Sequence, residues 1–119
     1  MAFLAIYQDS GSEKMFQLGD VTSIGRSEDN DITLADSRVS RYHVRISRRG
    51  ESFFLEDLAS SNGSFIGDEQ LPPHHPRELV DGDAIRIAST RLLYRLYRFV
   101  SASGETPRPA AAWSPNPIR

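Results

Sequence analysis

Short runs of apolar and β-branched residues, separated by polar or glycine-containing turns, make up most of the chain. The run 44–49 shows the pattern clearly, because Val44 and Ile46 alternate with polar residues, as in a strand that buries one face. The following segment, 49–51, has a central glycine and is typical of a hairpin turn. Other runs with strand character lie at 3–7, 14–18, 21–25, 31–34, 52–58, 64–67, 77–80, 84–88 and 91–99.

The last of these runs, 91–99, satisfies two patterns. Its leucines and Phe99 would line one face of a helix, whereas Leu92, Tyr94 and Leu96 alternate as in a strand. We predict a strand, because no run before it has helical periodicity. About eleven short, closely spaced strands indicate an all-β fold, a β-sandwich of mostly antiparallel strands.

The composition changes at Ser101. Four of the seven prolines lie in the segment 101–119, with alanine and serine between them. Such a segment is typical of a flexible or polyproline-like linker. We therefore predict one folded domain over residues 1–100, followed by a flexible tail over 101–119.

Composition and charge exclude several classes of function. The chain has no cysteine, which excludes disulfides, zinc–thiolate sites and a cysteine nucleophile. Its formal net charge of -2 argues against a general nucleic-acid binder. No apolar run has the roughly 20 residues that a membrane span requires, and the first residues lack the features of a signal peptide. We expect a cytoplasmic, monomeric domain that binds neither nucleic acid nor membrane and holds no cofactor or metal.

Three polar clusters lie in the predicted loops. They are the segments 25–27, 38–43 and 60–64, and each adjoins a predicted strand. Loops gather at the two ends of a sandwich, so residues that are distant in the sequence can form one binding surface.

The residues of these clusters, in their order and spacing, resemble the forkhead-associated (FHA) domain. The resemblance rests on Gly25-Arg26, Ser40-x-x-His43 and Asn62-Gly63, with Asp57-Leu58 ahead of the last pair, and it covers roughly residues 3–99. It implies an FHA/SMAD-like β-sandwich that binds phosphothreonine peptides in signalling, and a binding module rather than an enzyme. Ser61 and Ser64 depart from the family pattern, which frequently has threonine there, but the hydroxyl group is retained.

Phosphothreonine carries about -1.5 to -2 charge near neutral pH and three acceptor oxygens. The planar fork of a guanidinium matches such oxygens, and hydroxyl and amide groups supply smaller donors. By resemblance, Arg26, Ser40 and Arg41 contact the phosphate, Ser61 assists them, and Asn62 holds the peptide backbone. The phosphopeptide would come from a substrate of a Ser/Thr kinase.

Three further residues have structural roles by resemblance. Gly25 permits an unusual backbone or a close approach, His43 bridges loops by hydrogen bonds, and Gly63 supports the third loop. Taken alone, Asn62-Gly63 is typical of a hairpin turn. Among the arginines near the second cluster, Arg38 and Arg41 are the ones expected to attract an anion.

Other chemistries have weaker support. Ser40, His43 and Asp57 could form a hydrolase triad, but no nucleophile elbow or oxyanion loop accompanies them. The adjacent histidines 74–75 lack metal-ligand spacing, and the acidic segment 29–31 lacks the closing glutamate of a calcium loop.

Two alternatives stay open at this point. An FHA-like sandwich could serve as an assembly module that binds a partner independently of phosphate. In the tail, Thr106-Pro107 is a Ser/Thr-Pro site, and phosphorylated Thr106 could dock on its own domain or on a neighbouring copy.

Overall fold

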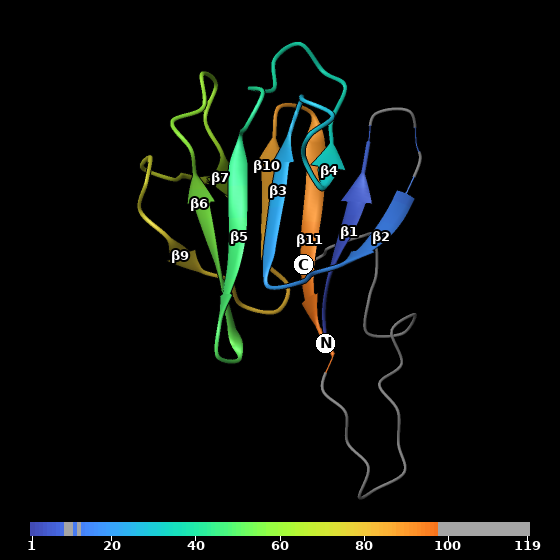
Figure 1. Ribbon diagram of the computed structural model, residues 1–119, viewed down its shortest axis with the longest axis vertical. Coiled ribbons are helices and arrows are strands. Elements are labelled where there is room, and N and C mark those ends of the chain that lie inside the picture. The colour runs from blue at the N-terminus through green and yellow to red at the C-terminus, as the bar shows by residue number, and fades with distance from the viewer. Residues whose placement is uncertain (9–10, 12, 98–119) are drawn as a thin grey trace, which may run out of the picture.

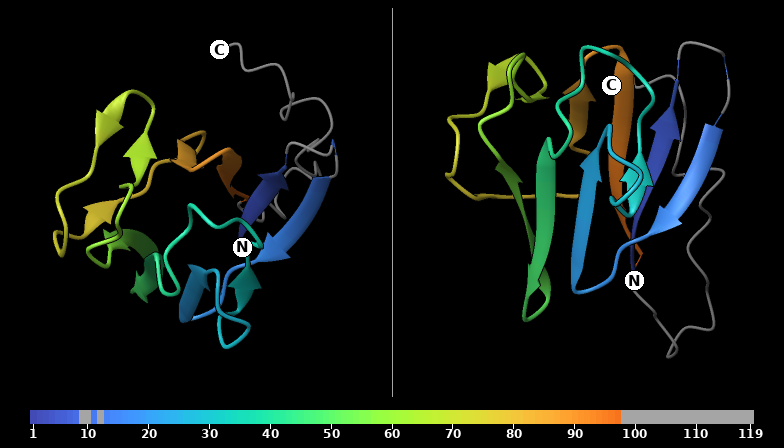
Figure 2. Two further views of the ribbon diagram at one scale, coloured as in Figure 1. Left: turned by 90° about the horizontal axis from the view of Figure 1, so that it is seen from above. Right: turned by 45° about the horizontal axis from the view of Figure 1, so that its top comes forward.

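The computed structural model describes residues 1–8, 11 and 13–97, and these residues form a β-sandwich of two sheets (Figure 1). Seen from above, the two sheets lie in separate layers that face each other (Figure 2). The predicted β-sandwich is therefore confirmed. Within the described part of the chain, no helix is long and apolar enough to cross a membrane.

Among the described residues, eleven strands build the two sheets. The six-stranded sheet has the order β2-β1-β11-β10-β7-β8, and its members are β1 (Ala2–Tyr7), β2 (Glu13–Gln17), β7 (Phe65–Ile66), β8 (Glu69–Gln70), β10 (Ala84–Ile87) and β11 (Thr90–Leu96). The five-stranded sheet has the order β4-β3-β5-β6-β9, and its members are β3 (Val21–Gly25), β4 (Ile32–Thr33), β5 (Val44–Arg49), β6 (Ser52–Asp57) and β9 (Arg77–Glu78). The strand pairs are antiparallel except β3 with β4, which is parallel.

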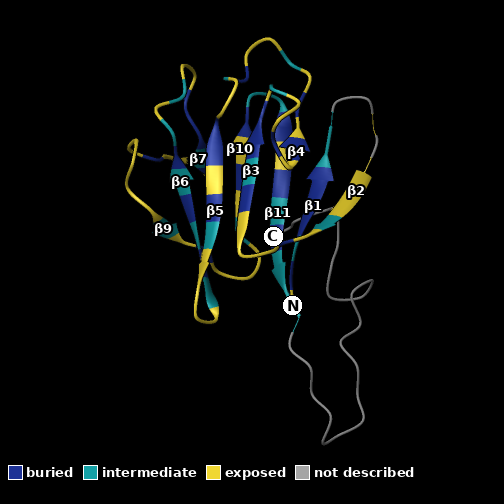
Figure 3. Cartoon of the chain, in the orientation of Figure 1, coloured by how far each residue is buried: buried dark blue, intermediate teal, exposed yellow. Residues whose placement is uncertain are grey.

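The core lies between the sheets and follows the predicted alternation. Val44 and Ile46 of β5 are fully buried, and Ile46 pairs in register with the fully buried Leu55 of β6. Leu92 and Tyr94 of β11 are buried as well, and they contribute to the core from the six-stranded sheet. Figure 3 shows this arrangement as dark blue strands, with exposed residues gathered in the loops and on β2.

The ambiguous run is a strand, and tertiary pairing explains why. β11 lies between β1 and β10, so both of its edges are hydrogen-bonded. Leucine and arginine favour helices only weakly, and two-sided pairing overrides that preference. Phe99 and the predicted tail 101–119 lie outside the described residues.

Sequence reasoning missed β8. This strand has only the two residues Glu69 and Gln70, both exposed, so no apolar residue marks it. It pairs with β7 across the turn at 67–68, where Gly67 has φ 59°.

The three polar loops lie at one end of the sandwich, at the top of Figure 1. They are the β3–β4 loop (26–31), the β4–β5 loop (34–43) and the β6–β7 loop (58–64). The N-terminus and the β5–β6 turn, with Gly50 at φ 63°, lie at the opposite end. The loops that carry the predicted site residues are thus neighbours in space.

We expect Leu55→Ala to lower the free energy of unfolding by about 2–5 kcal/mol, because it leaves a cavity at a fully buried position. Val21→Ala, at a position that is 58% exposed, should change it by less than about 0.5 kcal/mol. Urea denaturation of both variants measures the difference. Equal effects would contradict the assignment of Leu55 to the core.

Candidate functional site: three loops at one end of the sandwich

The β3–β4 and β4–β5 loops are joined through their backbones. Arg26 N donates to the carbonyl of Ser40 at 2.9 Å, and Ser27 N donates to the carbonyl of Arg41 at 3.2 Å. The Arg26 side chain adds a third bond, from Nε to the carbonyl of Val39 at 2.9 Å. This bond occupies one side of the guanidinium and leaves both Nη groups of the exposed side chain to other acceptors.

Gly25, the last residue of β3, lies close to the backbone of the β4–β5 loop. A Cβ at this position would overlap the carbonyl oxygen of Arg41, so only glycine fits without a shift of the backbone. Buried Asn30 strengthens the same junction, since its Nδ2 donates to the carbonyls of Ser27 at 2.8 Å and Arg41 at 2.7 Å. Sequence reasoning missed Asn30, although an asparagine in an acidic turn is a typical partner for nearby backbone groups.

His43 connects the second and third loops. The ring is fully buried, and its Nδ1 accepts from Ser40 N–H at 3.0 Å. Nε2 therefore carries the proton and donates to the carbonyl of Gly63 at 2.9 Å. The two ring nitrogens of one neutral imidazole thus satisfy a donor in the β4–β5 loop and an acceptor in the β6–β7 loop.

Two more bonds close the contact between these loops. Ser61 N donates to Ser40 Oγ at 3.0 Å, and Asn62 Nδ2 donates to the carbonyl of Arg38 at 2.7 Å. The hairpin interpretation of Asn62-Gly63 is wrong, because β6 and β7 belong to different sheets and the loop crosses between them. Gly63 has φ 85°, a conformation that favours glycine.

A buried carboxylate shapes the β6–β7 loop from within. Asp57 is 2% exposed and accepts from the backbone N–H of Ser60 and from the hydroxyls of Ser60 and Ser64. Ser60 Oγ in turn accepts from Gly63 N at 3.1 Å. A buried charge is tolerated when several donors surround it, so Asp57 and the serines fix the path of the loop together. Sequence reasoning used Asp57 as a marker of the motif and as a possible triad member, and missed its structural role in this loop.

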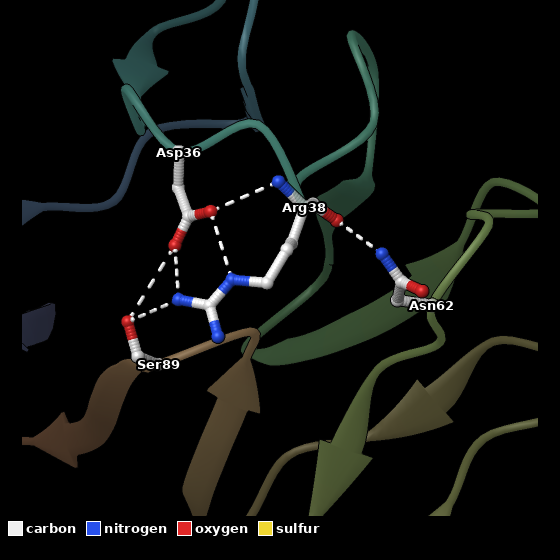
Figure 4. Close-up of polar contacts among 4 residues, drawn as sticks. All are labelled: Asp36, Arg38, Asn62 and Ser89. Carbon is white, nitrogen blue, oxygen red and sulfur yellow. Dashed lines mark hydrogen bonds and ion pairs between the residues drawn. The ribbon is translucent and has the colours of Figure 1, made fainter.

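The two arginines expected to attract an anion differ in orientation. The Arg38 guanidinium contacts Asp36 at 2.7 Å and Ser89 at 3.0 Å (Figure 4), so an acidic side chain already shares its charge, and its attraction for an anion stays a prediction. Its hydrogen bonds lower the pKa of Asp36 to about 2, which keeps the pair ionised. Arg41 is exposed, and its side chain makes no hydrogen bond or ion pair within the described residues.

The geometry does not assemble a hydrolase triad. Both nitrogens of His43 bind backbone groups, so neither is directed at the Ser40 hydroxyl or at Asp57. His74 and His75 have separate partners, Glu56 Oε2 at 3.4 Å and the carbonyl of Pro73 at 2.9 Å. No group of three or more His, Asp or Glu side chains is placed to hold a metal among residues 1–8, 11 and 13–97.

Taken together, the fold and the site define a β-sandwich interaction module whose candidate binding surface is built from loops at one end. The FHA domain family model matches residues 22–88, which is more than half of the chain. The chain therefore belongs to the FHA domain family.

Curated relatives include the FHA domain-containing protein FhaA of Mycobacterium tuberculosis, 34% identical over 90 residues that cover 75% of this chain and 16% of FhaA. The oxoglutarate dehydrogenase inhibitor of Corynebacterium jeikeium is 33% identical, over 78% of this chain and 63% of that protein. The FHA domain-containing protein PS1 of Arabidopsis thaliana is matched over only 6% of its length. The chain thus spans less than two thirds of these relatives.

Solved structures of FHA domains are also similar to this chain. One comes from work described as a structural and functional analysis of phosphothreonine-dependent FHA domain interactions, with a TM-score of 0.71, 31% identity, and coverage of 82% of this chain and 99% of that one. Another is the FhaA FHA domain complexed with the intracellular domain of Rv3910, with a TM-score of 0.68, 32% identity, and coverage of 77% and 99%.

Gly25→Ala tests the close approach of the first two loops. We expect it to lower the free energy of unfolding by about 1–3 kcal/mol, because the added methyl group forces the Arg41 backbone away. Gly19→Ala is the matched control, since a Cβ there meets nothing within 4 Å. Thermal or urea unfolding compares the two variants. An unchanged stability of Gly25→Ala would mean that the loops have room to separate.

Proposed function

We propose that this chain binds phosphothreonine-containing peptides through the loop surface formed by Arg26, Ser40, Arg41, Ser61 and Asn62. The observation that carries the proposal is the set of bonds between the three loops. Arg26 is tied to Val39, Ser40 to Ser61, and Asn62 to Arg38. Residues from three separate segments therefore occupy one surface, and family membership supports its use for phosphopeptides.

Each side chain keeps a group available for the ligand. Arg26 uses Nε to hold its own position and can offer its Nη groups to phosphate oxygens. Ser40 Oγ accepts from Ser61 N, so its hydroxyl hydrogen is left to donate. Asn62 donates through Nδ2, which leaves Oδ1 to accept from a peptide N–H. The Arg41 cation adds charge beside them.

The expected strength of binding is moderate. Two or three charge-assisted hydrogen bonds contribute roughly 1.5–3 kcal/mol each, and ordering of the peptide offsets part of this gain. The balance corresponds to a dissociation constant on the order of micromolar. Such a contact forms and dissociates readily, as signalling through a Ser/Thr kinase requires. A cytoplasmic location and a monomeric state remain predictions.

Arg26→Ala should weaken binding of a phosphothreonine peptide by about 30-fold or more, since it removes the bidentate donor. The control is Arg91→Ala, which removes an exposed arginine on β11 of the other sheet and should leave affinity unchanged. Calorimetry with peptides selected from a phosphothreonine library, and with unphosphorylated copies, provides the measurement. Equal binding of both peptide forms would instead favour a phosphate-independent assembly module.

Affinity should also fall as the pH drops below about 6, because the phosphate then takes up its second proton and loses charge. Asp36 does not contribute to this change, since its pKa of about 2 keeps it ionised throughout that range. A difluoromethylene phosphonate analogue, whose fluorines lower its second pKa, shows whether the ligand or the protein is titrating, because affinity for this analogue should fall only at a lower pH. If both ligands lose affinity at the same pH, a group on the protein is responsible.

A further inference from the structure

An ion pair outside the family motif adjoins the proposed binding surface, because Arg38 also accepts a hydrogen bond from Asn62. Asp36 Oδ1 accepts from Arg38 N at 2.9 Å and from Arg38 Nε at 3.1 Å, and Asp36 Oδ2 accepts from Arg38 Nη2 at 2.7 Å. Arg38 Nη2 also donates to Ser89 Oγ at 3.0 Å, and Ser89 Oγ lies 3.5 Å from Asp36 Oδ2. We call these three residues the Asp36–Arg38–Ser89 clamp; Figure 4 shows it.

The clamp joins the two sheets of the sandwich. Asp36 and Arg38 lie in the β4–β5 loop of the five-stranded sheet, whereas Ser89 lies in the β10–β11 turn of the other sheet. That turn is tight, because Ile87 pairs with Thr90 on either side of it and Ala88 has φ 54°. Ser89 therefore offers the loop a fixed point of attachment.

Immediately next to the clamp, two backbone carbonyls hold residues of the binding surface. The carbonyl of Arg38 accepts from Asn62 Nδ2 at 2.7 Å, and the carbonyl of Val39 accepts from Arg26 Nε at 2.9 Å. The direction of these carbonyls sets where the Asn62 amide and the Arg26 guanidinium point. A rotation of this part of the loop would move both side chains at once.

We propose that Asp36, Arg38 and Ser89 are positioning residues, which hold the carbonyls of Arg38 and Val39 so that Asn62 and Arg26 face the phosphopeptide. This inference rests on the proposed function and extends it to residues that do not contact the ligand. The same arrangement fixes the direction of Asn62 Oδ1, because Nδ2 of that amide donates to the carbonyl of Arg38.

The geometry of the clamp requires its particular side chains. Arg38 uses two nitrogens on one side of its planar guanidinium for Asp36, an arrangement that the single ammonium of lysine cannot reproduce. The backbone N–H of Arg38 binds the same carboxylate, so the peptide plane and the side chain are fixed together.

The clamp is expected to affect affinity more than global stability. The Arg38 side chain is 59% exposed and that of Asp36 is 20% exposed, so solvent screens their attraction. A loop that is held in its binding conformation before the peptide arrives loses less entropy on binding. Removal of the clamp should therefore weaken the complex while the melting temperature stays nearly unchanged.

The test compares Asp36→Asn with the control Asp20→Asn. The control removes another aspartate–arginine pair, Asp20 with Arg48 at 2.8 Å, which lies outside the three loops. Asp36→Asn should weaken binding of the library-selected phosphothreonine peptide by about fivefold to tenfold, and Asp20→Asn should not. Ser89→Ala should give a smaller loss that Ser89→Thr restores, since threonine keeps the hydroxyl.

Nuclear magnetic resonance supplies a readout that a general loss of stability would not move. The side-chain amide signals of Asn62 and the Nε–H signal of Arg26 should shift in Asp36→Asn and stay in place in Asp20→Asn. In an Asn62→Ala background, Asp36→Asn should cost less affinity than in the unaltered chain, because one of the two positioned side chains is gone.

Unchanged Asn62 and Arg26 signals in Asp36→Asn would overturn the proposal, as would equal affinity losses in Asp36→Asn and Asp20→Asn. Failure of the unaltered chain to prefer the phosphorylated peptide would instead refute the proposed function. In that case the Asn62 and Arg26 signals, which are measured without ligand, would still test whether the clamp positions these two side chains.

Discussion

The arrangement of the three loops depends on the buried imidazole of His43. The residue lies just before β5. Its backbone N–H donates to the carbonyl of Ile24 and its carbonyl accepts from Leu58 N–H, so the backbone that carries the ring is held on both sides. From there it satisfies a part-buried donor, Ser40 N–H, and a buried acceptor, the carbonyl of Gly63. Each such group left unpaired costs about 1–3 kcal/mol, so a side chain with one polar atom cannot replace it.

Backbone groups hold the loops, and side chains extend from them toward the solvent. Arg26, Ser40 and Asn62 each use one polar atom to fix their position and, in the proposed function, keep another for a ligand. This division explains how a chain with a formal net charge of -2 can present a local site for an anion. If these side chains bind the ligand as proposed, their attachment to the loops reduces the cost of ordering them on binding.

The longer strands were predictable because apolar and polar residues alternate where one face of a strand is buried, as at Val44 and Ile46. β8 was not, since two exposed residues carry no such signal. The convergence of the loops could be inferred from the family motif, but the roles of Asn30 and Asp36 could not. Both act on backbone groups of the β4–β5 loop, and nothing in residue type indicates which carbonyl or amide a polar side chain will meet.

The contacts of the Arg38 side chain were likewise not indicated by the sequence. Its charge and its place in the second polar cluster suggested that it attracts an anion, but they did not indicate that its guanidinium would contact Asp36 and Ser89. Ser89 comes from the opposite sheet, and Gly63 precedes a strand of that sheet as well. The proposed binding surface is therefore held from both layers of the sandwich, so its geometry depends on how the two sheets pack as well as on the loops themselves.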